Sequence, residues 1–180
     1  MLRDIGLILL FAAIIAALGL VPKLDLPMLG GVPITAQSLG VTLAGVMIGA
    51  RRGALAAAVF LLAVAFGLPL LAGGRGGIDV FTGPTAGFLL GFVPAAYITG
   101  LLFERSGRMG VFLAALIAAF IGGYVVLNLI GIPVMAWITD KTMREAVAVA
   151  TGLLPGGALK ALAVAVIAYL AAGMEPLGRH

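Results

Sequence analysis

The chain contains no cysteine, and its one histidine, His180, is the last residue. Without cysteine there can be no disulfide, no thiolate nucleophile and no cysteine-ligated metal. The sequence also lacks the H-E-x-x-H, G-x-S-x-G and Walker A patterns of metalloproteases, hydrolases and nucleotide-hydrolysing ATPases. We therefore expect no catalytic residues, no metal site and no bound cofactor, which means that the chain is not an enzyme.

Charge is scarce as well. Charged residues make up 10% of the 180 residues and hydrophobic residues 63%, whereas soluble domains average about 25% and about 45–50%. Such a chain lacks the polar side chains to cover a soluble fold, so its expected solvent is the lipid bilayer. The net charge of +4 is scattered between apolar runs, which argues against a nucleic-acid partner.

The apolar residues fall into six segments, close to the roughly 20 residues that a membrane helix needs. These segments are residues 5–21, 36–50, 53–71, 84–103, 110–135 and 153–173. They are apolar on all sides rather than alternating over stretches of about 10 residues, so they predict helices and not a β-barrel. We expect an all-α integral membrane protein, a single membrane domain over residues 1–180 that forms a bundle of six transmembrane helices.

The connections between the segments are unequal. The short ones are residues 50–53 and 104–109, and the long ones are residues 22–35, 72–83 and 136–152. With the N-terminus inside, six Lys or Arg residues fall on the cytoplasmic side and five outside, a small bias that favours both termini in the cytoplasm. The long connections are then elaborated extracellular loops. The third could hold a short interfacial helix capped by Thr139 or Asp140.

The stretch GGRGGIDVFTGPTAG, residues 73–87, is rich in glycine and carries an arginine. Its glycines, among them Gly74 and Gly76, allow backbone conformations with φ > 0 and the close approach of a ligand. Arg75 adds a planar donor fork suited to a carboxylate. Thr82 or Gly83 can cap the helix that follows, whose free N–H groups would face the loop. We favour a ligand-binding loop over the alternative, a flexible turn whose glycines serve helix packing.

Lys160, in LLPGGALKAL, is a cation within the last apolar segment. We expect Pro155 to begin that helix, which would put Lys160 about one turn inside it. There a cation opposes the helix dipole and, at the membrane interface, needs a partner. An anionic ligand would satisfy both needs; Asp79 or Asp140 could do so instead as a structural counter-ion.

Three further polar side chains lie in apolar segments. Gln37 follows Pro33 and Thr35 at the start of the second segment, and its amide needs partners for two donors and an acceptor. Tyr124 and Asn128 lie one helical turn apart in the fifth segment. For all three residues, the sequence alone does not decide between contact with a ligand and a hydrogen bond between helices.

Small residues repeat at every fourth position of the first segment. Ala12 lies over Ala16, and Ala13 over Ala17. Such a seam allows another helix to approach closely. The helix could belong to the bundle or to a partner protein, and the sequence alone does not choose.

Three stretches together resemble the BioY family, the biotin-binding S components of the energy-coupling-factor (ECF) vitamin transporters. They are GVPITAQSLGVTLAGVMIGARRGA, GLPLLAGGRGGIDVFTGPTAGFLLGF and LLPGGALKAL. The resemblance covers most of the chain. The alanines of the first segment also resemble the family's A-x-x-x-A motif, which docks a transmembrane coupling protein.

The resemblance implies a substrate-capture subunit of a bacterial-type cytoplasmic membrane, which holds biotin near the outer face. A transmembrane coupling protein and two cytoplasmic ATPase subunits would drive import. Lys160 is similar to the family's helix-six lysine, Gln37 to its Pro-x-Thr-x-Gln position, and the glycine loop with Thr85 to its central signature. Biotin carries a carboxylate, an apolar ring and chain, and a ureido group, which suits these side chains.

Three positions depart from the family pattern. Gly157 stands where an aspartate is frequent, Arg75 where some members carry asparagine, and Leu89 where some carry arginine. We take Asp79 as the nearest replacement for the missing acid. We expect Arg75 and Lys160 either to hold the carboxylate together or to divide the two polar ends of biotin between them. The alternatives are an S component for another vitamin and a structural membrane protein without a ligand site.

Overall fold

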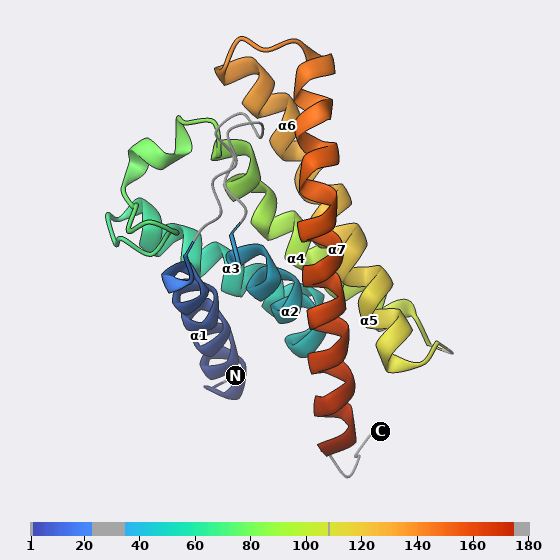
Figure 1. The fold of residues 1–180 in the computed structure, drawn as a ribbon. Helices are drawn as coiled ribbons and strands as arrows, with labels where there is room; N and C mark the ends of the chain where they lie inside the picture. Colours follow the sequence, from blue (N-terminus) through green and yellow to red (C-terminus); the bar gives the residue numbers. More distant parts are fainter. Residues whose placement is uncertain (1, 23–34, 108, 175–180) are drawn as a thin grey trace.

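The computed structural model describes residues 2–22, 35–107 and 109–174, and within these residues the regular structure is helical (Figure 1). Over these described ranges, six helical segments succeed one another. They are α1 (Leu2–Ala17), α2 (Gln37–Ile48), α3 (Ala50–Ala65), α4 (Ala86–Arg105), a continuous fifth segment, and α7 (Met143–Met174). The fifth segment consists of α5 (Val111–Phe120), the π-helical turn η4 (Ile121–Val126) and α6 (Leu127–Ile138). The described residues also form the short turns η1 (Leu18–Leu20) and η3 (Ile78–Phe81).

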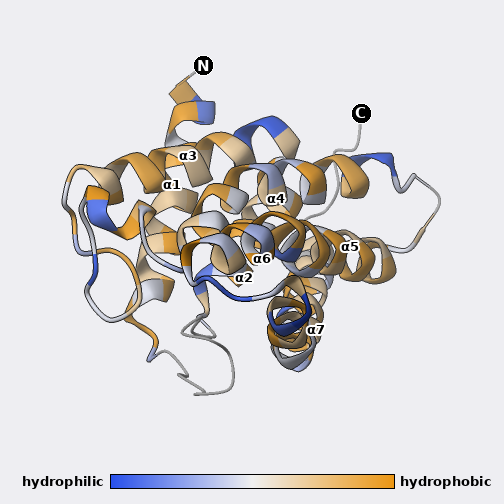
Figure 2. Ribbon diagram, turned by 90° about the horizontal axis from the view of Figure 1, so that it is seen from above, coloured by the Kyte–Doolittle hydropathy of each residue, from blue (hydrophilic) through white to orange (hydrophobic). Residues whose placement is uncertain are grey.

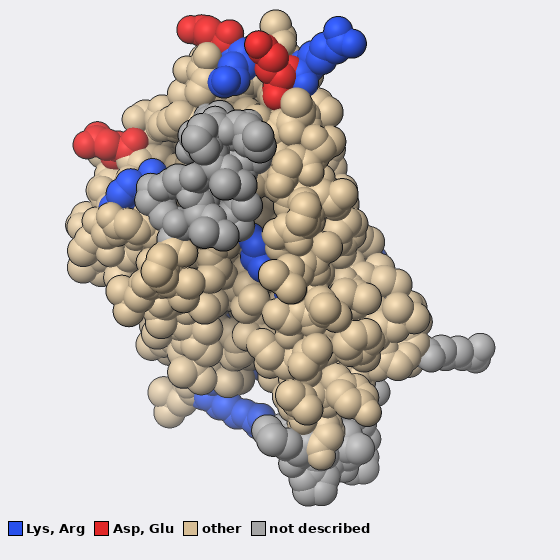
Figure 3. Space-filling model, in the orientation of Figure 1, with Lys and Arg blue, Asp and Glu red and all other residues tan. Residues whose placement is uncertain are grey.

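Among the residues that the structure describes, four stretches are long and apolar enough to cross a membrane. They are Leu2–Leu20, Ala86–Arg105, Val111–Ile138 and Met143–Gly173. Hydrophobic residues predominate along the helices, and strongly hydrophilic ones lie mainly near helix ends and in the connections (Figure 2). On the face in Figure 3, charged side chains gather at the top of the molecule, over the turn between α6 and α7, above a broad region in which charged side chains are few. Large apolar side chains such as Leu129 are exposed, as expected of a surface that faces lipid.

In the described part of the chain, the buried side chains form three packed clusters. One joins α1, α3 and α4 around Phe60 and Phe92, whose rings stack with centroids 6.3 Å apart. The second joins α2, α5 and α7 through many alanines. The third is smaller and joins α6 to the N-terminal half of α7 around Met135. The end of the α6–α7 pair that carries the turn between them therefore has a core of its own, next to the rest of the bundle.

Three helix boundaries differ from those expected from the sequence: the end of α3, the turn before α3 and the N-cap of α4. We expected α3 to run to residue 71, but it ends at Ala65 because Gly67 adopts φ +97°, the left-handed conformation that commonly terminates helices. The turn expected at residues 50–53 lies instead at Gly49, with φ +86°. The α4 helix has Thr85, rather than Thr82 or Gly83, as its N-cap.

The largest difference concerns α7. We expected its helix to begin at Pro155, after a separate interfacial helix, but α7 is continuous from Met143 and Pro155 lies inside it. Its start is fixed by Thr142 and Glu145: the Thr142 N–H donates to Glu145 Oε2 over 2.9 Å, and the Glu145 N–H donates to Thr142 Oγ1 over 3.4 Å. This reciprocal pair is a capping box. Neither Thr139 nor Asp140 is the cap, and Lys160 lies in the middle of the helix.

Candidate ligand-binding site

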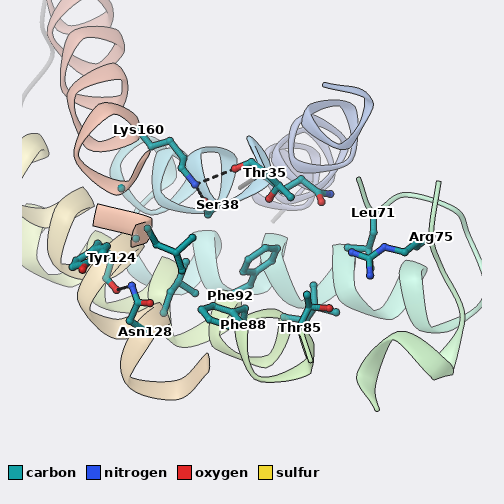
Figure 4. Close-up of a pocket in the computed structure, with 16 residues that line it drawn as sticks. Thr35, Ser38, Leu71, Arg75, Thr85, Phe88, Phe92, Tyr124, Asn128 and Lys160 are labelled. Atoms are coloured by element: carbon teal, nitrogen blue, oxygen red, sulfur yellow. Dashed lines mark hydrogen bonds between the residues drawn. The ribbon is translucent and has the colours of Figure 1, made fainter. Parts of the chain in front are cut away.

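A cavity lies between α2, the glycine-rich loop, α4, η4 with α6, and α7. Figure 4 shows the residues around it. Its lining consists of Thr35, Gln37, Ser38, Leu71, Arg75, Thr85, Phe88, Leu89, Phe92, Gly123, Tyr124, Leu127, Asn128, Leu153, Gly157 and Lys160. Its volume is about 90 Å³.

The glycine-rich loop closes one side of this cavity through a tight turn. Leu71 N–H donates to Arg75 O over 3.0 Å, and Arg75 N–H donates back to Leu71 O over 3.3 Å. Gly73 and Gly74 form the tip, with φ +83° and +68°, conformations that other residues rarely adopt. A side chain at Gly76 would collide with the Leu68 carbonyl. Gly74 and Gly76 thus shape the loop without lining the cavity, and Arg75 does line it.

Gln37 holds this loop against the bundle. Its Nε2 donates to Leu70 O over 3.0 Å and to Ile15 O over 3.4 Å, and its Oε1 accepts the Ala72 N–H over 3.2 Å. Only 2% of the residue is exposed. Both ends of the amide are therefore hydrogen-bonded to backbone groups. Although Gln37 borders the cavity, this favours a role in holding the fold together over contact with a ligand.

Lys160 reaches the cavity from α7. Its Nζ donates to Thr35 O over 3.0 Å and to Ser38 Oγ over 2.8 Å. Within the described ranges, Lys160 forms no ion pair with a carboxylate. Of the two counter-ions considered from the sequence, Asp79 is exposed on η3, Asp140 is exposed in the α6–α7 turn, and neither lines the cavity. Lys160 is thus a half-buried cation with neutral oxygen partners.

Tyr124 and Asn128 come from the fifth segment, at and just after its π-helical turn, a type of distortion that is frequent at functional sites. Tyr124 donates its hydroxyl to Ala150 O of α7 over 2.8 Å. Asn128 Nδ2 donates to Tyr124 O over 2.8 Å, while its Oδ1 is buried and has no hydrogen-bond partner among the described residues. Both residues line the cavity.

The wall formed by α4 was missed in part by the sequence reasoning. Thr85 was expected there, and it lies at the N-cap of α4 beside the cavity. Phe88, Leu89 and Phe92 follow it on one face of the helix and form an apolar wall. Their spacing from Thr85 was the available signal, but a membrane helix is apolar on all sides, so the pattern did not single out this face.

The polar groups of the cavity are distributed over its length. In Figure 4, Tyr124, Asn128 and Lys160 lie toward one side, and Leu71 and Arg75 lie at the other, with Phe88, Phe92 and Thr85 along the floor between them. The structure therefore brings together six of the expected residues, Lys160, Arg75, Gln37, Thr85, Tyr124 and Asn128. Asp79 does not replace an acid at this site, because its side chain lies outside the cavity.

The alanine seam of α1 has two different sides. Ala12 is buried and belongs to the core cluster, and Ala16 packs against it. Ala13 and Ala17 are exposed on the outer side of the helix. The first pair therefore serves packing within the bundle, and the second is open to another helix. Pro33, expected as the entry to the second helix, and His180 lie outside the described residues.

Comparisons with known proteins agree with the resemblance found in the sequence. The family model described as the BioY family matches residues 1–175. The chain is 48% identical to the biotin transporter BioY of Rhizobium etli over 170 residues, which cover 92% of this chain and 90% of the relative. It is 45% identical to the biotin transporter BioY of Rhodobacter capsulatus over 97% of this chain and 95% of that relative. These relatives are named as transporters, which confirms the expectation that the chain is not an enzyme.

A solved structure shares the fold. The crystal structure at 2.1 Å of the S-component for biotin from an ECF-type ABC transporter superposes with a TM-score of 0.87, over 97% of this chain and 93% of the other, at 23% identity. At that identity the likeness establishes the fold alone. It agrees with the expected helical membrane bundle.

Proposed function

The chain belongs to the BioY family, and from this membership and the cavity we propose that it captures biotin as the S component of an ECF-type transporter. The observation that carries the proposal is the position of Lys160, a cation that reaches the cavity from mid-helix without a carboxylate partner in the described part of the chain. A charge inside a membrane-spanning helix is costly and generally marks a functional site.

The cavity offers a complement for each part of biotin. The carboxylate needs a cation, and Arg75 supplies a guanidinium at one end. The ring sulfur and the valeryl chain need an apolar wall, which Phe88 and Phe92 of α4 supply. The ureido carbonyl needs a donor, and Lys160 supplies an ammonium at the other side. We propose that the two cations divide the polar ends of biotin between them.

We further propose that the α6–α7 turn and η3 face the outside of the cell. The N-terminal end of α1 and the C-terminal end of α7 lie at the opposite end of the bundle (Figure 1), which would place both termini in the cytoplasm. The open side of α1, with Ala13 and Ala17, would dock a transmembrane coupling protein. Two cytoplasmic ATPase subunits would then supply the ATP-driven import step.

The division of roles is tested by equilibrium binding to the purified chain in detergent. Two ligands are compared, biotin and its methyl ester, which keeps the ureido group and lacks the charge. Arg75→Gln should weaken biotin binding and abolish the preference for the acid over the ester, because the guanidinium is the partner of the carboxylate. Lys160→Met should weaken both ligands by similar factors. Arg51→Gln, which removes an exposed guanidinium of α3, is the matched control and should change neither.

Two results would contradict the proposal. The first is the absence of saturable biotin binding by folded wild-type protein, which would remove biotin as the ligand. The second is wild-type affinity for biotin in both Arg75→Gln and Lys160→Met, which would remove these residues from the site.

A further inference from the structure

An acceptor without a donor lines the proposed biotin site. Asn128 Oδ1 is buried without a hydrogen-bond partner among the described residues, and its side chain borders the cavity. An amide oxygen left in this way forfeits a hydrogen bond, so such groups are rare in folded proteins. Thr99 Oγ1 is also buried and unpaired, but Thr99 does not line the cavity. Asn128 thus holds the unpaired acceptor that a ligand could reach.

The orientation of this amide is fixed by its other end. Asn128 Nδ2 donates to Tyr124 O over 2.8 Å, and rotation of the amide by half a turn would set oxygen against oxygen. Figure 4 shows the nitrogen toward Tyr124 and the oxygen on the other side. The Asn128 oxygen therefore cannot exchange places with the nitrogen at low cost.

Tyr124 is itself held firmly. Its hydroxyl donates to Ala150 O over 2.8 Å, its ring stacks on Phe120 with centroids 5.2 Å apart, and the ring packs against Gly157. The carbonyl that orients Asn128 thus belongs to a residue tied to α7. The acceptor is preorganised, which reduces the cost of binding a ligand that matches it.

We propose that Asn128 determines specificity by accepting a hydrogen bond from an N–H group of the ligand. This inference rests on the proposed function and deepens it, since in biotin the donor is a ureido nitrogen. The ureido group would then be read from two sides, its carbonyl by the Lys160 ammonium and one N–H by Asn128. A site that hydrogen-bonds an N–H rejects analogues without it, because the acceptor is left buried and unpaired.

A cycle of variants and ligands tests this assignment. Biotin is compared with its two ureido N-methyl derivatives, each of which lacks one N–H. The wild-type chain should bind one derivative about 10- to 100-fold more weakly than biotin. Asn128→Ala should lose about the same factor for biotin and should no longer discriminate against that derivative, because the acceptor is gone and space is available for the methyl group.

The ratio of the affinities for biotin and for the N-methyl derivative distinguishes a specificity role of Asn128 from a structural role. A purely structural role for Asn128 would weaken biotin and the derivative equally and leave their ratio unchanged, which would overturn the inference. Thr99→Val removes the other unpaired buried group and should leave both affinities at wild-type values. If Asn128→Ala does not fold, Asn128→Leu preserves the side-chain volume and should show the same loss of biotin affinity; wild-type affinity in it would overturn the assignment. Failure of the wild-type chain to bind biotin would instead refute the proposed function, and this inference with it.

Discussion

The ring of Tyr124 occupies the space that a side chain would fill at Gly157 of α7. A Cβ placed on Gly157 would lie 2.7 Å from Tyr124 Cδ2 and 3.2 Å from Cγ. The same ring donates its hydroxyl to Ala150 O, also on α7. The tyrosine and the glycine are thus complementary, and an acidic residue at position 157 could not coexist with this ring position.

Gly157→Ala should therefore destabilise the chain even though alanine is the better helix former. Overpacking against the ring costs about 1–3 kcal/mol, and the gain in helix propensity returns at most about 1 kcal/mol. We expect a net loss of about 1–2 kcal/mol, measured as a lower midpoint of thermal unfolding in detergent. Gly173→Ala, in the same helix with no atom within 4 Å of its Cβ, should be neutral or stabilising. Equal effects of the two substitutions would contradict the packing account.

Gln37→Met should loosen the glycine-rich loop. The substitution leaves the Leu70 carbonyl and the Ala72 N–H without their partners, at a cost of about 1–3 kcal/mol for each buried group. We expect a loss of about 2–4 kcal/mol in unfolding free energy and weaker biotin binding, because Arg75 belongs to the same loop. Thr82→Val removes an exposed hydrogen bond to Asp79 O and should change stability by less than about 0.5 kcal/mol. A stable Gln37→Met chain would show that the amide does not secure the loop.

The double substitution Ala13→Leu and Ala17→Leu should reduce biotin uptake without affecting biotin binding. Both residues are exposed on α1, so the chain should fold and bind biotin normally. The added volume should prevent the close approach of a coupling helix and lower biotin uptake by about tenfold or more in cells that supply the partner subunits. Ala148→Leu, on an exposed side of α7, is the control and should transport normally. Normal uptake by the double variant would place the docking surface elsewhere.

The absence of cysteine makes the orientation directly testable. Thr82→Cys follows η3, and Met109→Cys lies between α4 and α5; both positions are exposed. In intact cells a membrane-impermeant maleimide should label the first variant and not the second, which should react only after permeabilisation. The reverse pattern would invert the proposed orientation.

The sequence was informative where a signal is local. Six apolar segments and the residue types around Lys160 and Arg75 could be identified because membrane helices are long and their polar residues are few. The continuity of α7 through Pro155 could not be predicted from the sequence, because proline usually begins or breaks a helix. In the turn before Pro155, the Ala150 carbonyl accepts the Tyr124 hydroxyl from a residue 26 positions away. This contact ties α7 to the fifth segment and leaves no local pattern in the sequence.

The roles of Gln37 and Asn128 were equally open in the sequence, and tertiary contacts separate them. Gln37 meets backbone groups that lie 22, 33 and 35 positions away, which no periodicity indicates. Asn128 has one end paired and one end unpaired. Two amides that look alike in sequence therefore differ, because one is saturated by the fold and the other is not.

The central claim, capture of biotin by this chain alone, is tested most directly by equilibrium binding of labelled biotin to the purified protein in nanodiscs, without ATP or partner subunits. The account predicts saturable binding of one biotin per chain, displaced by unlabelled biotin and not by thiamine or riboflavin. A folded chain that binds no biotin, or binds it no better than those vitamins, would contradict it.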